Sequence, residues 1–266
     1  MLKRIILLFL FSLLLTSCQK QTFPDDNAVK LPDTPPVTDT ETAEVTETEP
    51  TVIGELEGRV FCIDPGHGDF AEAYTEPIGP GATEMKAAFV SGTSGAYQTE
   101  AEFNLKMAYL LKGMLEEKGA EVHMTRSDEN AALSNIGRAE FANGLGCDMV
   151  VRIHADGSEN TSAKGISVLI PAQNQYLNDP YVLSASKNAG QYVLDSMISA
   201  AGAENRGLIL RDDLTGFNWT KVPCILVECG FMSNPDEDLL LADENYRILL
   251  AEGITKGLIE YYMTVQ

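Results

Sequence analysis

The order of apolar and polar residues predicts a domain in which strands and helices alternate along the chain. Apolar residues spaced three and four apart, as in 101–118, indicate amphipathic helices, and short apolar runs indicate buried strands. Strands are expected at 59–64, 121–125, 148–153, 165–170 and 224–228, and helices at 101–118, 132–142, 183–201 and from the cap Asp243 to Tyr262. This alternation favours an α/β fold whose sheet is covered by helices on both faces.

A different pattern opens the chain. Lys3 and Arg4 precede an apolar run over residues 5–15, which is about half the ~20 residues that a membrane-spanning helix needs. This arrangement predicts a signal peptide over residues 1–17. The run ends in LTSC, which resembles a bacterial lipobox, so we expect cleavage before Cys18 and lipidation of that cysteine. The alternative is an ordinary cleaved signal followed by an incidental cysteine.

The segment after Cys18 has little to bury. Residues 19–54 are rich in Thr, Glu, Asp and Pro, and they carry eight acidic and two basic side chains. Such a composition predicts a disordered, self-repelling linker. We therefore divide the chain into a signal peptide at 1–17, a lipidated linker at 18–54 and one catalytic domain at 55–266.

The charge excludes one class of partner. The 266 residues include 39 acidic and 19 basic side chains, a net charge of −20, whereas nucleic-acid binding needs a positive surface. The 44% hydrophobic content is that of an ordinary globular protein, which we expect to be a monomer. Four cysteines follow Cys18 and form no CxxC pair: Cys62, Cys147, Cys224 and Cys229. Three of them lie in or beside apolar runs, where a free cysteine is usually a small buried residue, and the sequence leaves their disulfide state open.

Three of the predicted strands lead into residues that could hold or serve a metal. The first strand is followed by the turn PGHG, which presents His67, the strand at 148–153 is followed by His154, and the strand at 224–228 ends in Glu228. Ligands of open α/β sheets bind beyond the carboxyl ends of strands, so these three residues are expected to meet. His123 lies inside a predicted strand and is interpreted as structural.

A catalytic zinc usually has three protein ligands and one open position, so two histidines need a partner. The sequence from Thr99 to Glu102 has the form of a capping box, in which Glu102 binds the Thr99 amide. Glu100 is then free to be the third ligand, and Glu102 is the alternative. Either glutamate also fits a simpler role as a favourable charge at a helix N-terminus.

The ordered motifs IDPGHG, TEAEFNL, RIHAD and VPCILVECGFMSNPDED resemble those of the zinc-dependent N-acetylmuramoyl-L-alanine amidases of the type 3 family. The resemblance extends over residues 58–262 and includes HMTRSDENAALSNIGRAEFAN between the motifs. It implies one Zn²⁺ held by His67, Glu100 and His154, with Glu228 as the catalytic carboxylate. It also implies a twisted, mostly parallel mixed sheet of about six strands, flanked by helices on both faces as in zinc exopeptidases.

The same resemblance implies a function. The expected reaction is hydrolysis of the amide between N-acetylmuramic acid and L-alanine of peptidoglycan, with Glu228 as general base. The protein would act outside the cytoplasm, anchored to the membrane through Cys18 and facing the cell wall. The alternatives are a zinc peptidase that cuts within the stem peptide, and a non-catalytic wall-binding lipoprotein with the same fold.

Two features depart from the family pattern. Arg152 stands where a small residue is usual, and we expect its side chain to point away from the metal face and to alter packing only. The 32 residues between His67 and Glu100 are more than the simplest members have. This segment, 68–99, is expected to be a loop over the site. It could grip the stem peptide, act as a lid or have no function.

Overall fold

The computed structural model describes residues 54–70 and 72–265. The predicted signal peptide, Cys18 and nearly all of the predicted linker lie outside the described residues, so their structure stays a prediction. Within the described part of the chain, no helix is long and apolar enough to cross a membrane.

The described residues form eight strands and six helices in a largely alternating order, as the sequence predicts. The strands are β1 Val60–Pro65, β2 Thr75–Pro77, β3 Met85–Ala87, β4 Glu121–Met124, β5 Met149–Asp156, β6 Ile166–Pro171, β7 Asn205–Arg211 and β8 Cys224–Phe231. The helices are α1 Glu100–Glu117, α2 Asn135–Leu145, α3 Pro180–Ala201, α4 Thr215–Asn218, α5 Pro235–Ala242 and α6 Glu244–Thr264.

Six of the strands form one mixed sheet in the order β4-β1-β5-β8-β6-β7. The first four are parallel to one another, β6 is antiparallel to β8, and β7 is parallel to β6. The carboxyl ends of β4, β1, β5 and β8 therefore meet at the same edge of the sheet. The expected fold class, a mostly parallel six-stranded sheet flanked by helices, is confirmed. The short strands β2 and β3 form a separate antiparallel hairpin.

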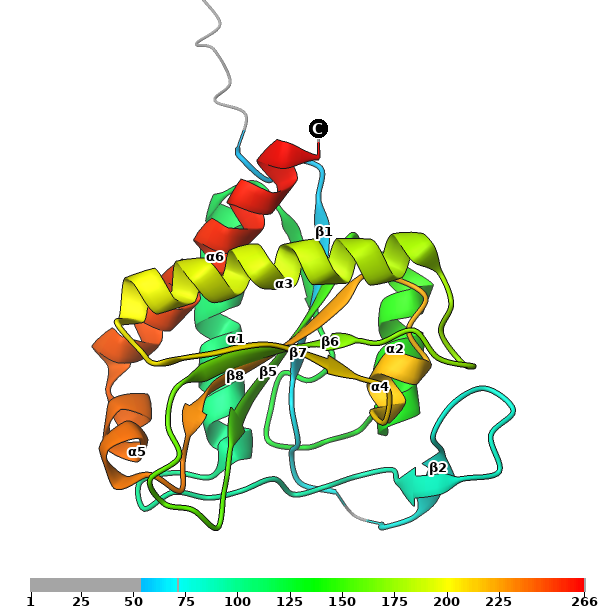
Figure 1. Ribbon diagram of the computed structural model, residues 1–266, viewed down its shortest axis with the longest axis horizontal. Coiled ribbons are helices and arrows are strands. Elements are labelled where there is room, and N and C mark those ends of the chain that lie inside the picture. Colours follow the sequence, from blue (N-terminus) through cyan, green and yellow to red (C-terminus); the bar gives the residue numbers. More distant parts are fainter. Residues whose placement is uncertain (1–53, 71, 266) are drawn as a thin grey trace, which may run out of the picture. The chain divides into compact units, whose positions relative to one another are not determined.

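The two faces of the sheet are covered unequally. Alternate residues such as Phe61 and Ile63 of β1 pack into a large core with α1, α3 and α6, in which α6 contacts both α1 and α3. The intervening Cys62 belongs to a smaller apolar cluster with residues of α2 and of α4, two helices that lie together in Figure 1. Because side chains alternate along a strand, Asp64 shares the face of Cys62, which is the thinly covered one.

Several boundaries differ from the predicted ones for local reasons. Helix α2 begins three residues later than expected because the Ser134 hydroxyl accepts from the Gly137 amide and caps the helix there. Helix α3 begins at Pro180, since Asp179 caps it and proline suits the first turn. Strands β5 and β8 both run past their apolar runs, because they pair with each other as far as Asp156 and Phe231. The short elements β2, β3, β7, α4 and α5 were not predicted.

Candidate metal centre

The turn after β1 holds His67 in an unusual backbone conformation. His67 has a φ of 60°, and it is the only residue other than glycine with a positive φ among those that the structure describes. Such a conformation costs roughly 1–3 kcal/mol and persists only where the surroundings enforce it. Gly66 is required beside it, because a Cβ atom there would lie 2.2 Å from Cε1 of His154.

Two buried arginines bind the carbonyl groups of this turn. Arg138 donates from Nη2 to the His67 oxygen (2.7 Å) and from Nη1 to the Pro65 oxygen (2.8 Å). Arg126 donates to the Pro65 oxygen (2.9 Å) and to the Gly66 oxygen (2.9 Å). Hydrogen bonds from charged donors are the stronger kind, so these contacts hold the imidazole of His67 in place. Sequence analysis missed both arginines.

Helix α1 presents Glu100 from its first turn. The predicted capping box is present: Thr99 caps the helix, and the Glu102 carboxylate accepts from the Thr99 amide at 2.8 Å. Glu102 is therefore occupied at the helix end, whereas Glu100 is only 4% exposed and faces the sheet. The local cap thus decides which of the two glutamates enters the site.

His67, Glu100 and His154 converge at the sheet edge. One carboxylate oxygen of Glu100, Oε1, lies 2.9 Å from Nε2 of His67 and 3.0 Å from Nδ1 of His154. One ligand-capable atom from each residue lies within 4.8 Å of the others. The two imidazoles meet edge to face, with ring centroids 4.8 Å apart. Sequence reasoning predicted these three residues as a set, and the structure brings them together as a His-Glu-His triad.

The surroundings favour protonation states that suit metal ligands. Burial alone would raise the pKa of Glu100, but its contacts with His154 and His67 lower it below the usual range. Burial lowers the pKa of His154 in spite of the neighbouring carboxylate. An ionised carboxylate and a neutral imidazole are the forms that coordinate a metal. Nε2 of His154 is buried and has no hydrogen-bond partner among the described residues.

Glu228 lies on β8 beside this triad. Its Cα pairs with that of His154 across the parallel strands β5 and β8, and both residues lie within their strands rather than at the predicted ends. Burial and the nearby carboxylates of Glu100 and Asp156 raise the pKa of Glu228 well above its usual value. Its Oε2 atom is buried and unpaired among the described residues.

A cavity of about 430 Å³ joins these groups. Its lining includes the three triad residues and Glu228, together with Asp156 and Arg211. Pockets of a few hundred Å³ are typical of small-ligand sites. The triad and the Glu228 carboxylate therefore line one accessible space.

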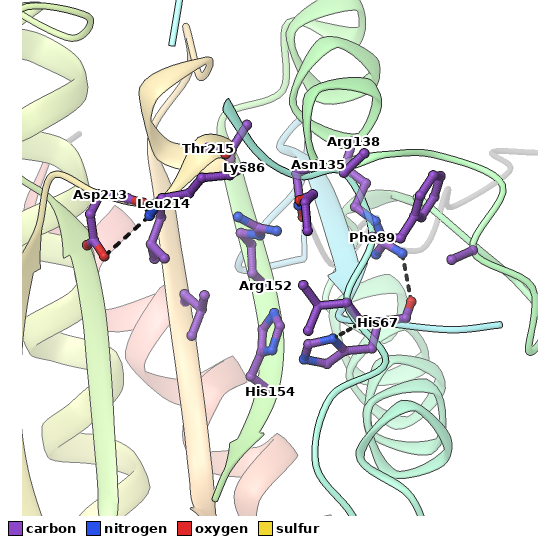
Figure 2. A pocket seen from close by; sticks show the side chains of 16 residues that line it. His67, Lys86, Phe89, Asn135, Arg138, Arg152, His154, Asp213, Leu214 and Thr215 are labelled. Atoms are coloured by element: carbon purple, nitrogen blue, oxygen red, sulfur yellow. Dashed lines mark hydrogen bonds and ion pairs between the residues drawn. The ribbon is translucent and has the colours of Figure 1, made fainter. Parts of the chain in front are cut away.

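The expectation for Arg152 is wrong. Arg152 and His154 are two positions apart on β5, so both side chains point to the same face. Both line a second cavity beside the triad, as Figure 2 shows. Nε of Arg152 donates to Oδ2 of Asp64 at 2.8 Å, and Arg138 binds the other oxygen of that carboxylate at 2.6 Å. The alternation of side chains along a strand would have predicted that Arg152 and His154 share a face.

The segment 68–99 contacts the triad near its carboxyl-terminal end. The Val90 carbonyl lies 2.7 Å from Nδ1 of His67, and the Thr93 amide donates to Oε2 of Glu100 at 2.9 Å. Glu76 of β2 accepts from the Ile136 amide at 3.0 Å, which attaches the hairpin to α2. The segment therefore supports two of the three triad residues, a role that sequence analysis had not assigned to it.

The remaining candidates lie elsewhere. His123 contacts Glu121 on the edge strand β4, with 2.7 Å between Nε2 and Oε1, and it is not part of the triad. The four cysteines of the described chain are buried and free: Cys62, Cys147, Cys224 and Cys229. Burial raises the pKa of Cys147 to about 11 and that of Cys224 to about 12, so their thiols are neutral. They act as small core residues.

Comparison with solved structures gives the same fold. The chain is similar to the N-acetylmuramyl-L-alanine amidase Ami1 of Mycobacterium smegmatis, with 28% identity and a TM-score of 0.71 over 79% of this chain and 99% of that one. The apo form of Ami1 from Mycobacterium abscessus matches with 29% identity and a TM-score of 0.70, over 77% and 99% of the respective chains.

Comparison with curated sequences and family models extends this likeness. The Staphylococcus aureus protein named "Probable cell wall amidase LytH" is 28% identical over 209 residues, 78% of this chain and 60% of that protein. The chain therefore matches only 60% of that relative's length. A family model described as N-acetylmuramoyl-L-alanine amidase matches residues 61–260, which include the triad and Glu228. By this match, and by the fold and triad that accompany it, the chain belongs to the N-acetylmuramoyl-L-alanine amidase family.

Proposed function

We propose that this protein hydrolyses the amide between N-acetylmuramic acid and L-alanine of peptidoglycan, with one Zn²⁺ held by His67, Glu100 and His154 and with Glu228 as general base. The observation that carries the proposal is the convergence of two imidazoles on one buried carboxylate, opposite a second buried carboxylate on the neighbouring strand.

The three residues of the triad fit a zinc ion. Two histidines and one glutamate are a donor set that catalytic zinc sites use, with one position left for water or substrate. Ligands about 2.0 Å from a tetrahedral ion lie roughly 3.3 Å apart, and the contacts of 2.9 and 3.0 Å to Oε1 of Glu100 are close to that spacing. When bound, zinc would polarise the amide carbonyl and lower the pKa of water to about 7.

Glu228 would carry the proton between the attacking water and the leaving amine. Glu228 lies beside the triad, lines the same cavity and has an unpaired carboxylate oxygen, so in its ionised form it would accept a proton from an attacking water. It can then return that proton to the departing amine of L-alanine. As a fourth ligand Glu228 would close the position that the water needs.

The cavities leave room for substrate on either side of the triad. The space beside Glu228 and the second cavity beside Arg152 share His67, His154, Leu214 and Leu226 in their linings. A scissile amide placed over the triad would therefore have one side directed into each cavity.

The proposed setting is the outer face of a bacterial membrane. Relatives named as cell wall amidases favour action outside the cytoplasm. The signal-like N-terminus and the LTSC sequence favour anchoring of a monomer through a lipidated Cys18, with the linker 18–54 and the domain 55–266 projecting toward the wall.

The direct test is digestion of purified peptidoglycan by the full chain, with the metal content measured on the same preparation. We expect about one zinc per chain and intact stem peptides that carry a free L-alanine amine, identified by mass spectrometry. Stems cut between their own residues would instead indicate a peptidase. A metal-free protein that binds walls without releasing peptides would overturn the proposal in favour of a binding lipoprotein.

A further inference from the structure

A second cavity of about 360 Å³ lies beside the triad, and the proposed function leaves open which group of the substrate enters it. We call it the Arg152 pocket. Its apolar walls come from the 68–99 segment, from the stretch before α4 and from β8, and include Phe89, Leu214 and Leu226. Its polar lining includes Lys86, Asn135 and Arg152, and Figure 2 shows these side chains around one space with His154.

Arg152 has donors left over at the floor of this pocket. The residue is only 7% exposed, and the one hydrogen bond that its guanidinium makes to a described residue runs from Nε to Asp64. Nη1 and Nη2 of the guanidinium donate to no described residue. A Cβ atom at Gly216 would lie 1.9 Å from Nη1, so the pocket has room for this arginine only because residue 216 is glycine. A buried guanidinium with unused donors is a site for an acceptor.

The charges around the pocket do not balance. Asp64 is shared between Arg138 and Arg152, and Asp213 is shared between Lys86 and Arg211. Arg211 lines the neighbouring cavity with Glu228 and Asp156. The cations of the Arg152 pocket itself, Lys86, Arg138 and Arg152, meet these two carboxylates and leave an excess of one positive charge. This local excess favours an anionic ligand, and the fork of the guanidinium matches a carboxylate.

We infer that the Arg152 pocket binds a carboxylate of the stem peptide next to the scissile amide, through Nη1 and Nη2 of Arg152 with support from Lys86. The inference rests on the proposed amidase function, because that function places the amide over the triad. It makes Arg152 a specificity-determining residue that selects stems with a free carboxylate over stems in which that group is amidated.

The wild-type protein provides the first test. Two muramoyl peptides are compared that differ only in a carboxylate or a carboxamide on the second stem residue. We expect kcat/KM to be at least about tenfold higher for the carboxylate, the usual effect of a hydrogen bond to a charged group. A third peptide has a carboxamide at the second residue and a free carboxylate at the third. Its kcat/KM shows whether the pocket binds the carboxylate of the second or of the third stem residue. Equal kcat/KM for all three peptides would overturn the inference.

Substitutions then assign the preference to the pocket. Arg152→Gln should reduce the ratio of kcat/KM for the carboxylate peptide to kcat/KM for the carboxamide peptide to about one. Arg152 also binds Asp64, so a second variant is needed in case this one fails to fold: Lys86→Gln should lower the ratio several-fold. Arg59→Gln is the matched control. It also removes one positive charge, but at the amino-terminal end of β1, away from the triad, where Arg59 pairs with Asp148 at 3.1 Å. A ratio unchanged in folded Arg152→Gln would contradict the assignment.

Binding separates the two proposals. Calorimetry with the same peptides and the zinc-loaded Glu228→Gln variant measures affinity without turnover, and hydrolysis is assayed with the wild-type protein. Tighter binding of the carboxylate peptide without hydrolysis of either would leave the pocket in place and refute the amidase function. Hydrolysis of both peptides with equal affinity and equal rate would refute the pocket and leave the amidase function in place.

Discussion

His154 and Glu228 lie directly opposite each other on the parallel strands β5 and β8, paired at their Cα atoms. Both side chains project to the thinly covered face of the sheet, His154 toward Glu100 and Glu228 into the adjoining cavity. A nitrogen of the first and an oxygen of the second are buried without partners among the described residues. Buried polar groups normally have partners, so each of these two unpaired atoms marks a residue placed for a role other than packing.

Glu228→Gln tests the assigned general base. The substitution keeps the shape of the side chain and removes its basicity, so we expect near-normal zinc content and a rate at least about 10²-fold lower. Amide hydrolysis and bound zinc are measured on the same sample. A variant that hydrolyses at close to the wild-type rate would contradict the mechanism, and a folded variant without zinc would make Glu228 a ligand.

Alanine at any one triad position should remove zinc and activity together. The three variants are His67→Ala, Glu100→Ala and His154→Ala, and the reason is that a site with three protein ligands loses most of its affinity with any one of them. His123→Ala is the control, since His123 contacts Glu121 away from the triad. Elemental analysis after dialysis is the measurement. Zinc retained by Glu100→Ala but lost from His123→Ala would overturn the ligand set.

Gly66→Ala should disturb the centre without any change of charge. The new Cβ would lie 2.2 Å from the His154 ring, so that ring or the turn must move and zinc affinity should fall. Gly113→Ala is the matched control: nothing lies within 4 Å of a Cβ there, and the change within α1 should stabilise the protein by about 0.5–1 kcal/mol. Competition with a chelator of known affinity compares the two. Equal zinc affinity would show that the close approach at Gly66 has no effect.

Asp64→Asn should destabilise the fold strongly. Asp64 is 1% exposed and bridges two buried guanidiniums, and loss of one partner from a buried ion pair costs about 3–5 kcal/mol. Denaturant unfolding at pH 7 measures the free energy. Glu116→Gln, which breaks the exposed pair of Lys112 and Glu116 within α1, should cost no more than about 0.5 kcal/mol. Equal costs for the two variants would contradict this account.

The same carboxylate predicts a pH dependence. Burial opposes ionisation of Asp64, but Arg138, Arg152 and Thr125 outweigh it and hold its pKa below the usual range. A depressed pKa contributes stability that is fully present above the unfolded value of about 3.9 and is lost as the pH falls toward the folded value. The stability gap between wild type and Asp64→Asn should therefore narrow below about pH 4. A gap that stays constant from pH 7 to pH 3 would refute this.

Cys18→Ala should release the protein from the membrane. If the LTSC sequence directs lipidation, the wild-type chain fractionates with membranes and its N-terminal peptide carries the mass of attached lipid. The variant should appear in the soluble exported fraction with its amidase activity unchanged. Membrane association that survives the substitution would show that another feature holds the protein there.

The main architecture and the residues of the candidate site could both be predicted from the sequence. Apolar periodicity located the principal strands and helices, since one face of each must be buried. The chemistry at the ends of the runs identified His67, His154 and Glu228, because parallel strands bring their carboxyl ends to one edge. The capping box, a local signal, favoured Glu100 over Glu102 as the third member.

Features that depend on contacts between distant segments could not be predicted from the sequence. The strands β2, β3 and β7 are short or largely exposed, so they have no clear apolar pattern, and their pairing with other segments defines them. The hairpin attaches to α2 through Glu76, 60 positions away from Ile136. Arg152 carries a charge in the middle of a buried strand, and only Asp64, 88 positions away, explains it. A buried charge needs a partner, and the fold alone determines which partner comes within reach.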